Sequence, residues 1–292
     1  MTLREITLSD GETLAVWESG PIDAPACLFL HGFPENHRAW RHQIQHLDSA
    51  YRCIAPDLRG YGASSKPADV AAYATPRLVA DVLELADALG LERFTLLGHD
   101  WGGLLAWEVA TAAPDRLNAL VVANSPHPAQ FQHLLNTDPA QRAASAYINL
   151  LRSSAIDPIL AKHGLAPVLQ QAFGDGALRA MEREELGALL EQWRDPATAM
   201  AMVNWYRASG ITLPAEAAPI TPPAAQPITT PTLVLWGEDD TALLPANLEG
   251  LAAFAPNHTI IRLPNTGHFS PWQAPEAVNQ AITGFLSKNR LS

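Results

Sequence analysis

The sequence predicts an α/β fold, in which helices flank a mostly parallel β-sheet and a helical segment is inserted into the core. Short apolar runs, typical of buried strands, alternate with stretches of helical spacing, in the order 26–30, 38–47, 52–56, 76–89, 94–97, 104–113 and 117–123. Strands and helices that alternate in this way form parallel sheets covered on both faces. With 292 residues and 48% hydrophobic content, the chain can bury the core that such a fold needs.

Two further segments complete the predicted sheet. Near the N-terminus, Thr2 to Leu8 and Thr13 to Glu18 read as two strands joined by a turn at Ser9-Asp10-Gly11, which is typical of an antiparallel hairpin at a sheet edge. Toward the C-terminus the alternation resumes, with the order strand, helix, strand and helix at 232–236, 248–255, 259–263 and 275–286.

Between these parts the strand pattern stops, and residues 128–214 read as a series of helices. Their predicted breaks are Pro139, Pro158, Gly164, Pro167, Gly174 and Pro196. The stretch from Pro214 to Pro231 reads as a stiff return linker, because it also carries Pro219, Pro222, Pro223 and Pro227. We therefore expect a core formed by residues 1–127 and 215–292, and a helical cap formed by residues 128–214.

Composition excludes several classes of function. The formal charge of −11 gives no basic surface for nucleic acid or an anionic membrane. Met1 to Ile6 lacks the apolar region of a signal peptide, and no apolar stretch is long enough to cross a bilayer. We expect a soluble cytoplasmic protein, a monomer or homodimer, in which Cys27 and Cys53 are reduced and buried in strands.

Two other groups of polar residues are interpreted as structural. His42 and His46 are four residues apart, but Gln43 replaces the glutamate of the metal-binding H-E-x-x-H pattern, so we expect a solvated helix face and no metal. Asp57 and Arg59 are opposite charges in a glycine-containing loop, where such pairs usually have a structural role.

The stretch Gly98-His99-Asp100-Trp101-Gly102-Gly103 is the first candidate for chemistry. It lies between a predicted strand and a predicted helix and has the G-x-nucleophile-x-G spacing of a sharp turn that exposes one strained side chain. Asp100 occupies the position of the nucleophile. A carboxylate there favours attack on a saturated carbon, forming an ester that water later cleaves. The alternative is that Asp100 only caps the following helix.

A carboxylate and a histidine follow Asp100 in loops after later strands, in the chain order nucleophile, acid, histidine. Spacing alone does not choose the acid among Glu238, Asp239 and Asp240. His268 either has a structural role in its loop or is the base that activates water, and its place after the last strand favours the base. The acid would fix the imidazole tautomer and stabilise the imidazolium.

Hydrolysis of an ester on Asp100 also requires backbone N–H groups that stabilise an oxyanion. We expect these donors to be the backbone amides of Trp101, directly after the nucleophile, and Phe33, in the loop after the strand at 26–30. Because only the backbone donates, their side chains could still be ordinary core aromatics.

Five motifs together resemble the epoxide hydrolase branch of the α/β-hydrolase superfamily. They are His31-Gly32-Phe33-Pro34-Glu35, Asp57-Leu58-Arg59-Gly60-Tyr61-Gly62, Gly98-His99-Asp100-Trp101-Gly102-Gly103, Asn204-Trp205-Tyr206-Arg207 and Gly267-His268. The resemblance spans nearly the whole chain and implies an α/β-hydrolase core with a helical lid, an active site between them and no cofactor. It also implies that Asp240 is the acid. The corresponding Phe-Pro bond is often cis in this family, which would fit Phe33-Pro34, but the sequence leaves cis and trans open.

The resemblance further implies two cap tyrosines that bind the epoxide oxygen and protonate it as the ring opens. Of five tyrosines, only Tyr147 and Tyr206 fall in the predicted cap. Ordinary packing is the alternative for both. We expect Phe33, Pro34 and Trp101 to contact the substrate, a small epoxide that water converts to a vicinal diol.

Three other functions are alternatives to this one. A haloalkane dehalogenase would use the same aspartate, but related dehalogenases commonly have Asn in place of Phe33 or use a second halide-binding tryptophan, for which Trp193 or Trp205 is a candidate. Fluoroacetate dehalogenases have Arg directly after the nucleophile, where this chain has Trp101. A non-catalytic ligand-binding protein of the same fold would have lost at least one chemical residue, and here none is missing.

Overall fold

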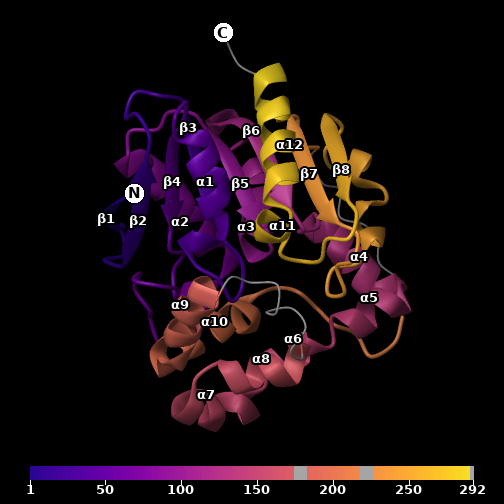
Figure 1. Cartoon of the computed structure of the whole chain (residues 1–292). Coiled ribbons are helices and arrows are strands. Elements are labelled where there is room, and N and C mark those ends of the chain that lie inside the picture. Colours follow the sequence, from indigo (N-terminus) through magenta and orange to yellow (C-terminus); the bar gives the residue numbers. More distant parts are fainter. Residues whose placement is uncertain (174–182, 218–226, 290–292) are drawn as a thin grey trace.

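The computed structural model of the chain describes residues 1–173, 183–217 and 227–289, and within these ranges it contains an eight-stranded sheet with helices on both faces (Figure 1). The strand order is β1-β2-β4-β3-β5-β6-β7-β8. The strands are β1 (Thr2–Thr7), β2 (Thr13–Ser19), β3 (Ala26–Leu30), β4 (Arg52–Pro56), β5 (Phe94–His99), β6 (Leu117–Ala123), β7 (Thr232–Gly237) and β8 (His258–Leu263).

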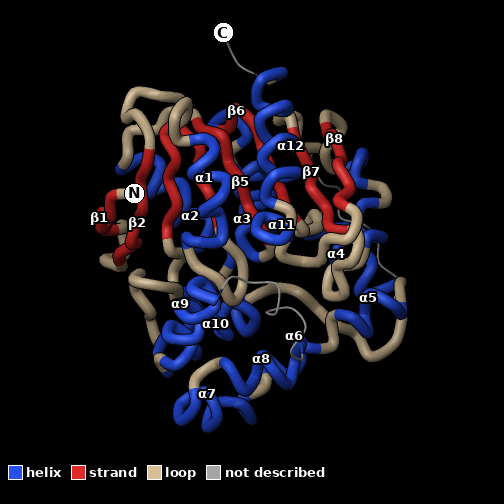
Figure 2. The backbone as a smooth tube through the Cα atoms, in the orientation of Figure 1, coloured by secondary structure: helices blue, strands red, loops and turns tan. Residues whose placement is uncertain are grey.

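The strand directions confirm the prediction of a mostly parallel sheet. β1 and β2 form an antiparallel hairpin at one edge, β2 is antiparallel to β4, and the remaining neighbours are parallel. Figure 2 shows that the parallel strands end at one edge of the sheet, where the loops that follow them converge. In open α/β sheets, this edge is where ligands bind.

Side-chain alternation along the strands divides the core into two layers. In β3, Leu28 and Leu30 belong to the layer that also contains α2 and α3, whereas Cys27 and Phe29 face the layer under α1 and α12. Cys27 is the register partner of Cys53 in β4, and both are free, buried thiols. The helices that cover the sheet are α1 (Arg41–Leu47), α2 (Thr75–Ala88), α3 (Trp101–Ala112), α11 (Ser270–Gln273) and α12 (Pro275–Lys288).

The structure corrects three predicted boundaries. The predicted helix at 248–255 is wrong: this region contains two short 3-10 turns, Pro245–Leu248 and Leu251–Ala253, because Gly250 between them has a φ of 71° and interrupts helical geometry. β5 extends through His99, and α3 begins at Trp101 instead of Leu104. The turn that contains Asp100 is therefore tighter than the apolar pattern predicts.

The described part of the segment between β6 and β7 is mostly helical, and its helices lie across the carboxyl ends of the strands in Figure 1. Its helices are α4 (Pro128–Thr137), α5 (Pro139–Ala144), α6 (Tyr147–Arg152), α7 (Asp157–His163), α8 (Ala166–Phe173), α9 (Arg183–Arg194) and α10 (Pro196–Ala208). Several predicted breaks are starts of helices, since proline suits the first turn. Gly174 and the prolines at 219, 222 and 223 lie outside the described residues. The boundaries of core and cap given above stay a prediction.

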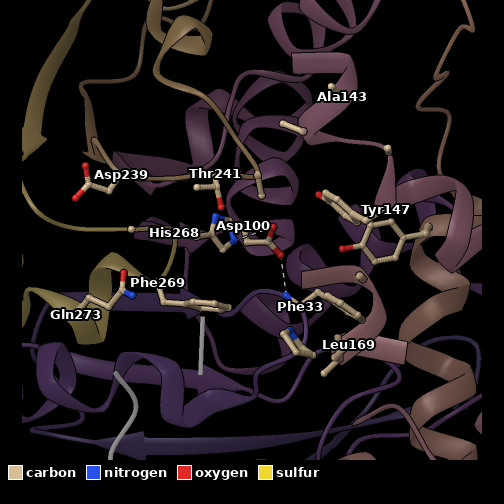
Figure 3. A pocket seen from close by; sticks show the side chains of 17 residues that line it. Phe33, Asp100, Ala143, Tyr147, Leu169, Asp239, Thr241, His268, Phe269 and Gln273 are labelled. Atoms are coloured by element: carbon tan, nitrogen blue, oxygen red, sulfur yellow. Dashed lines mark hydrogen bonds and ion pairs between the residues drawn. The ribbon is translucent and has the colours of Figure 1, made fainter. Parts of the chain in front are cut away.

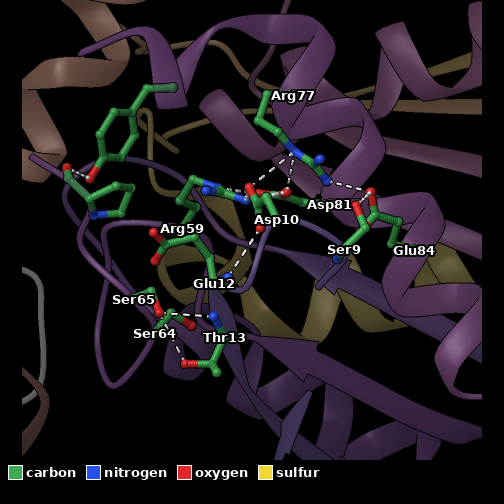
Figure 4. Close-up of polar contacts among 12 residues, drawn as sticks. Ser9, Asp10, Glu12, Thr13, Arg59, Ser64, Ser65, Arg77, Asp81 and Glu84 are labelled. Atoms are coloured by element: carbon green, nitrogen blue, oxygen red, sulfur yellow. Dashed lines mark hydrogen bonds and ion pairs between the residues drawn. The ribbon is translucent and has the colours of Figure 1, made fainter. Parts of the chain in front are cut away.

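A network of charges, buried at Arg59 and Asp81 and partly exposed at its other members, joins the β1–β2 turn, the loop after β4 and helix α2 (Figure 4). Arg59 donates to both carboxylate oxygens of Asp81 and to Asp10, and Arg77 donates to Asp81 and Glu84. The carbonyl of Arg59 accepts the indole N–H of Trp205, in α10, at 2.9 Å. These contacts agree with a structural role for Arg59, which anchors α10 over the sheet.

The described ranges contain neither a membrane-spanning helix nor a cluster of metal ligands. None of the helices there combines the length and the apolar character that crossing a bilayer requires. No cluster of three or more His, Cys, Asp or Glu side chains in those ranges is arranged to hold a metal ion.

Candidate active site

Asp100 is the single residue between β5 and α3, and its backbone is strained, with φ 51° and ψ −120°. The flanking glycines permit this turn. A Cβ at Gly98 would lie 2.3 Å from the carbonyl oxygen of Gly102, and a Cβ at Gly102 would lie 2.3 Å from that of Leu30. The Asp100 side chain makes no hydrogen bond to the helix that it precedes. Capping therefore does not explain this residue.

His268 lies between two carboxylates. Its Nδ1 is 2.8 Å from Oδ2 of Asp240, and its Nε2 is 3.4 Å from Oδ2 of Asp100. Of the three carboxylates that compete for the role of the acid, Asp240 is the one whose side chain contacts His268. Glu238 is exposed and lies 3.7 Å from Arg262, and Figure 3 shows the carboxylate of Asp239 turned away from His268.

Asp240 is held in place by bonds to both of its oxygens. The backbone amides of Ala242 and Leu243 donate to Oδ1 at 2.9 Å each, and the side-chain amide of Asn124 donates to Oδ2 at 2.9 Å. Asn124 follows β6, is fully buried, has a φ of 42°, and accepts the N–H of Gly237. Our sequence reasoning missed Asn124; an asparagine directly after a buried strand is the signal that could have found it.

For Asp100 and His268, neighbouring charges and hydrogen bonds shift the pKa in the direction opposite to the effect of burial. Burial raises the pKa of Asp100, but the hydrogen bond and charge of His268 and the N–H of Phe33 outweigh it and hold this pKa below its ordinary value. For His268, burial lowers the pKa, and the charges and hydrogen bonds of Asp240 and Asp100 raise it well above its usual range. The resting site thus contains an anionic Asp100 beside an imidazolium.

A second layer of buried residues supports the backbone of His268. His99 places Nε2 2.9 Å from the carbonyl oxygen of His268 and Nδ1 2.8 Å from Glu35, whose other oxygen accepts the indole N–H of Trp272 at 2.8 Å. Burial raises the pKa of Glu35, but His99 and Trp272 lower it below its ordinary value, so Glu35 is a carboxylate. Both nitrogens of His99 thus lie within hydrogen-bond distance of acceptor oxygens.

Tyr147 begins α6 and Tyr206 lies in α10, and their ring centroids are 6.1 Å apart. Figure 3 shows Tyr147 across the cavity from Asp100, with its hydroxyl directed into the cavity. Burial, and to a lesser degree the charge of Asp100, raises the pKa of Tyr147 and of Tyr206 well above the usual value. Both phenols therefore keep their protons at neutral pH and can donate hydrogen bonds to a ligand.

The loop after β3 brings Phe33 against Asp100. The amide of Phe33 donates to Oδ1 of Asp100 at 2.7 Å, and the Phe33-Pro34 bond is cis. Trp101 is the first residue of α3, where backbone amides have no partner within the helix. The rings of Phe33 and Trp101 pack edge-on against Tyr206, with centroids 5.1 and 5.0 Å away.

The two tryptophans considered as halide ligands are committed to other bonds. The indole N–H of Trp193 donates to the carbonyl of Pro34 at 2.7 Å, and that of Trp205 donates to Arg59. Both side chains are about 1% exposed. An indole that already donates its one N–H inside the protein is not free to bind a halide.

These residues surround a cavity of about 560 Å³, drawn in Figure 3. Asp100, His268, both tyrosines, Phe33 and Pro34 line it together with apolar side chains. A volume of this size suits a small organic ligand. A much smaller void of about 30 Å³ shares Asp100, Tyr147 and Tyr206 with this cavity and is also lined by Trp101.

Comparisons with known proteins agree with this geometry. Residues 25–275 match the alpha/beta hydrolase fold family. Mouse epoxide hydrolase 4 is 31% identical over 277 residues, which cover 92% of this chain and 75% of that protein. A solved structure of novel epoxide hydrolases from metagenomes of hot environments is 49% identical, with a TM-score of 0.94 over 98% of this chain and 99% of that one.

A variant of an epoxide hydrolase from Bacillus megaterium, complexed with its product (R)-3-[1]naphthyloxy-propane-1,2-diol, is 26% identical, with a TM-score of 0.87 over 97% of this chain and all of that one. The resemblance found in the sequence motifs is thereby confirmed. The chain belongs to the alpha/beta hydrolase fold family, in the branch that its epoxide hydrolase relatives form.

Proposed function

We propose that this protein hydrolyses epoxides to vicinal diols through a covalent ester on Asp100. The observation that carries the proposal is the arrangement around that carboxylate. One oxygen accepts the amide of Phe33, and the other faces His268 at the cavity, across from Tyr147. The relatives named above support the reaction class, and the product bound by the Bacillus megaterium enzyme is a diol.

In the first step, Oδ2 of Asp100 attacks one carbon of the epoxide and the bond from that carbon to the ring oxygen breaks. The electron pair of that bond moves to the ring oxygen, which takes a proton from the hydroxyl of Tyr147 or Tyr206. Their elevated pKa values keep these hydroxyls protonated until an alkoxide forms. General acid assistance of this kind contributes about 10²–10⁴ in rate.

In the second step, Nε2 of His268 takes a proton from water, and the water oxygen attacks the carbonyl carbon of the ester. The negative charge that develops on the carbonyl oxygen is stabilised by the amides of Phe33 and Trp101. Collapse of the intermediate breaks the bond between the carbonyl carbon and the diol oxygen. The diol leaves with the proton from His268, which Asp240 has stabilised as an imidazolium. Asp100, left as a carboxylic acid, releases its proton to solvent, and the tyrosinate takes a proton up from solvent.

The rival functions have less support. For dehalogenation, the indoles of Trp193 and Trp205 would have to give up buried hydrogen bonds before they could bind a halide. For a non-catalytic protein, the close approach of Asp100, His268 and Asp240 would have no purpose. Cytoplasmic location and a monomeric or homodimeric state remain predictions.

The test is to trap the ester in the variant His268→Gln. After exposure to styrene oxide, intact-mass measurement is expected to show one added substrate mass, located on Asp100 by peptide mapping. The double variant with Asp100→Asn should gain none. The control variant His163→Gln, at an exposed histidine in α7, should turn over without an adduct.

Two outcomes would contradict the mechanism. The first is diol formation by the wild-type protein without any adduct in His268→Gln. The second is an adduct that persists when Asp100 is replaced. Release of bromide from 1-bromobutane, with no diol from styrene oxide, would favour the dehalogenase instead.

A further inference from the structure

Two cavities of very different size meet at the proposed reacting centre. The large one has a volume of about 560 Å³ and the small one about 30 Å³. Asp100, Tyr147 and Tyr206 line both of them. These are the nucleophile and the two hydroxyls that would hold an epoxide ring, so the ring would lie where the two cavities meet.

We propose that the substrates of this enzyme are one-armed epoxides, with a large apolar substituent on one ring carbon and at most a methyl group on the other. This inference rests on the proposed function. An epoxide ring fixed by Asp100 and the two tyrosines directs the substituents of its two carbons in opposite directions. One arm enters the large cavity, and whatever the other carbon bears enters the small void.

The large cavity suits an apolar arm. Asp239, Thr241 and Gln273 contribute polar groups to its lining, but most of the described wall is small or apolar. These side chains come from α5, α8, the residue before α6 and the loops after β3 and β8, and include Ala143, Ala144, Ala146, Leu169, Ala172 and Phe33. Small side chains on two helices leave room for an aromatic ring or a branched chain. The volume lies in the range of sites for drug-sized ligands.

The small void excludes a second large arm. A cavity of about 150 Å³ is needed to bind benzene, and about 30 Å³ holds a water molecule or a methyl group. Branched and aromatic side chains close it: Leu104, Phe131, Ile148, Ile211 and Leu243. Leu243 is 5% exposed, and Ile211 is half-buried in the loop after α10.

The test compares kcat/KM for three epoxides that share one phenyl arm and differ on the second carbon. Styrene oxide bears only hydrogen there, trans-β-methylstyrene oxide a methyl and trans-stilbene oxide a second phenyl. We expect the wild-type enzyme to hydrolyse the first two at rates within about tenfold of each other. We expect it to hydrolyse stilbene oxide at least about 100-fold more slowly, since a pocket discriminates by about 10–200-fold for one unaccommodated methylene.

The variants Leu243→Ala and Ile211→Ala enlarge the small void from two different elements. At least one is expected to raise the ratio of kcat/KM for stilbene oxide to that for styrene oxide about tenfold or more. This ratio does not depend on the fraction of folded enzyme. Leu286→Ala is the matched control, because Leu286 is also 5% exposed but lies in α12 on the other face of the sheet, and it should leave the ratio unchanged.

The outcomes separate this inference from the proposed function. Wild-type turnover of stilbene oxide within tenfold of styrene oxide would overturn the one-armed substrate class. So would an unchanged ratio in both void-enlarging variants. Failure of the wild-type enzyme to open any of the three epoxides would instead overturn the proposed function on which the inference rests.

Discussion

Replacement of Glu35 by glutamine tests whether the buried pair with His99 supports the site. The carboxylate accepts from His99 at one oxygen and from Trp272 at the other, both at 2.8 Å, and it is 2% exposed. Glutamine has the same shape but only one acceptor oxygen. In Glu35→Gln, the amide nitrogen must therefore face either the indole N–H of Trp272 or Nδ1 of His99, so the two hydrogen bonds that the carboxylate accepts cannot both be kept.

The size of the effect follows from these contacts. A buried donor left unpaired costs about 1–3 kcal/mol, and breaking a buried charge pair by removing one partner costs about 3–5 kcal/mol. The two costs overlap because they concern the same contacts. We expect a loss of about 3 kcal/mol. For a chain of this length, with an unfolding entropy of about 0.6 kcal/mol/K, that loss lowers Tm by about 5 °C.

The assay is unfolding by urea and by heat, together with single-turnover kinetics of styrene oxide opening and ester hydrolysis. Glu5→Gln, at an exposed position of β1, is the control and should change Tm by less than about 1 °C. Because His99 bonds the carbonyl of His268, Glu35→Gln is also expected to slow ester hydrolysis. Unchanged stability and unchanged hydrolysis in Glu35→Gln would refute the reasoning.

Three further predictions concern single groups. Tyr206→Phe should slow ester formation by about 10²–10⁴ in single-turnover kinetics and leave hydrolysis of the ester nearly unchanged; equal slowing of both steps would argue against proton donation. As the pH is lowered, ester hydrolysis should slow at a higher pH than ester formation does. Asp100 keeps its charge below the ordinary pKa of an aspartate, whereas His268 must be neutral to act as a base. Intact-mass analysis should therefore find more of the covalent adduct at about pH 5 than at about pH 8. Asp57 is buried, and although burial raises its pKa, hydrogen bonds from His37 and Ala63 lower this pKa from 3.8 to about 2. The ionised Asp57 carboxylate therefore contributes about 2 kcal/mol to the free energy of unfolding above pH 3.8, and this contribution is lost as the pH falls toward 2. Urea unfolding of Asp57→Asn at a series of pH values should lack this pH-dependent part of the stability.

Local patterns in the sequence predicted the parts of the fold that depend on local interactions. The glycines around Asp100 predict a tight turn because no side chain fits beside the carbonyls of Gly102 and Leu30. The alternation of apolar segments likewise predicted the parallel sheet. The predicted helix at 248–255 failed for an equally local reason, since Gly250 in a left-handed conformation outweighs the apolar spacing.

The supporting residues of the site could not be predicted in the same way. Asn124 and Asp240 are 116 residues apart, and His99 and Glu35 are 64 apart, so neither contact leaves a periodic signal in one sequence. Spacing also could not rank the three carboxylates of the loop after β7. Only the folded chain places one of them under His268.

The charges of the site also suggest why the two proposed steps occur in order. In the resting enzyme, Asp240 and Asp100 together raise the pKa of His268 well above its usual range, which favours the imidazolium over the neutral base. Formation of the ester removes the negative charge of Asp100, and with it one of the two charges that raise this pKa. The imidazolium can then release its proton to solvent, while Asp240 alone keeps the ring oriented. The base therefore becomes available only after there is an ester to hydrolyse.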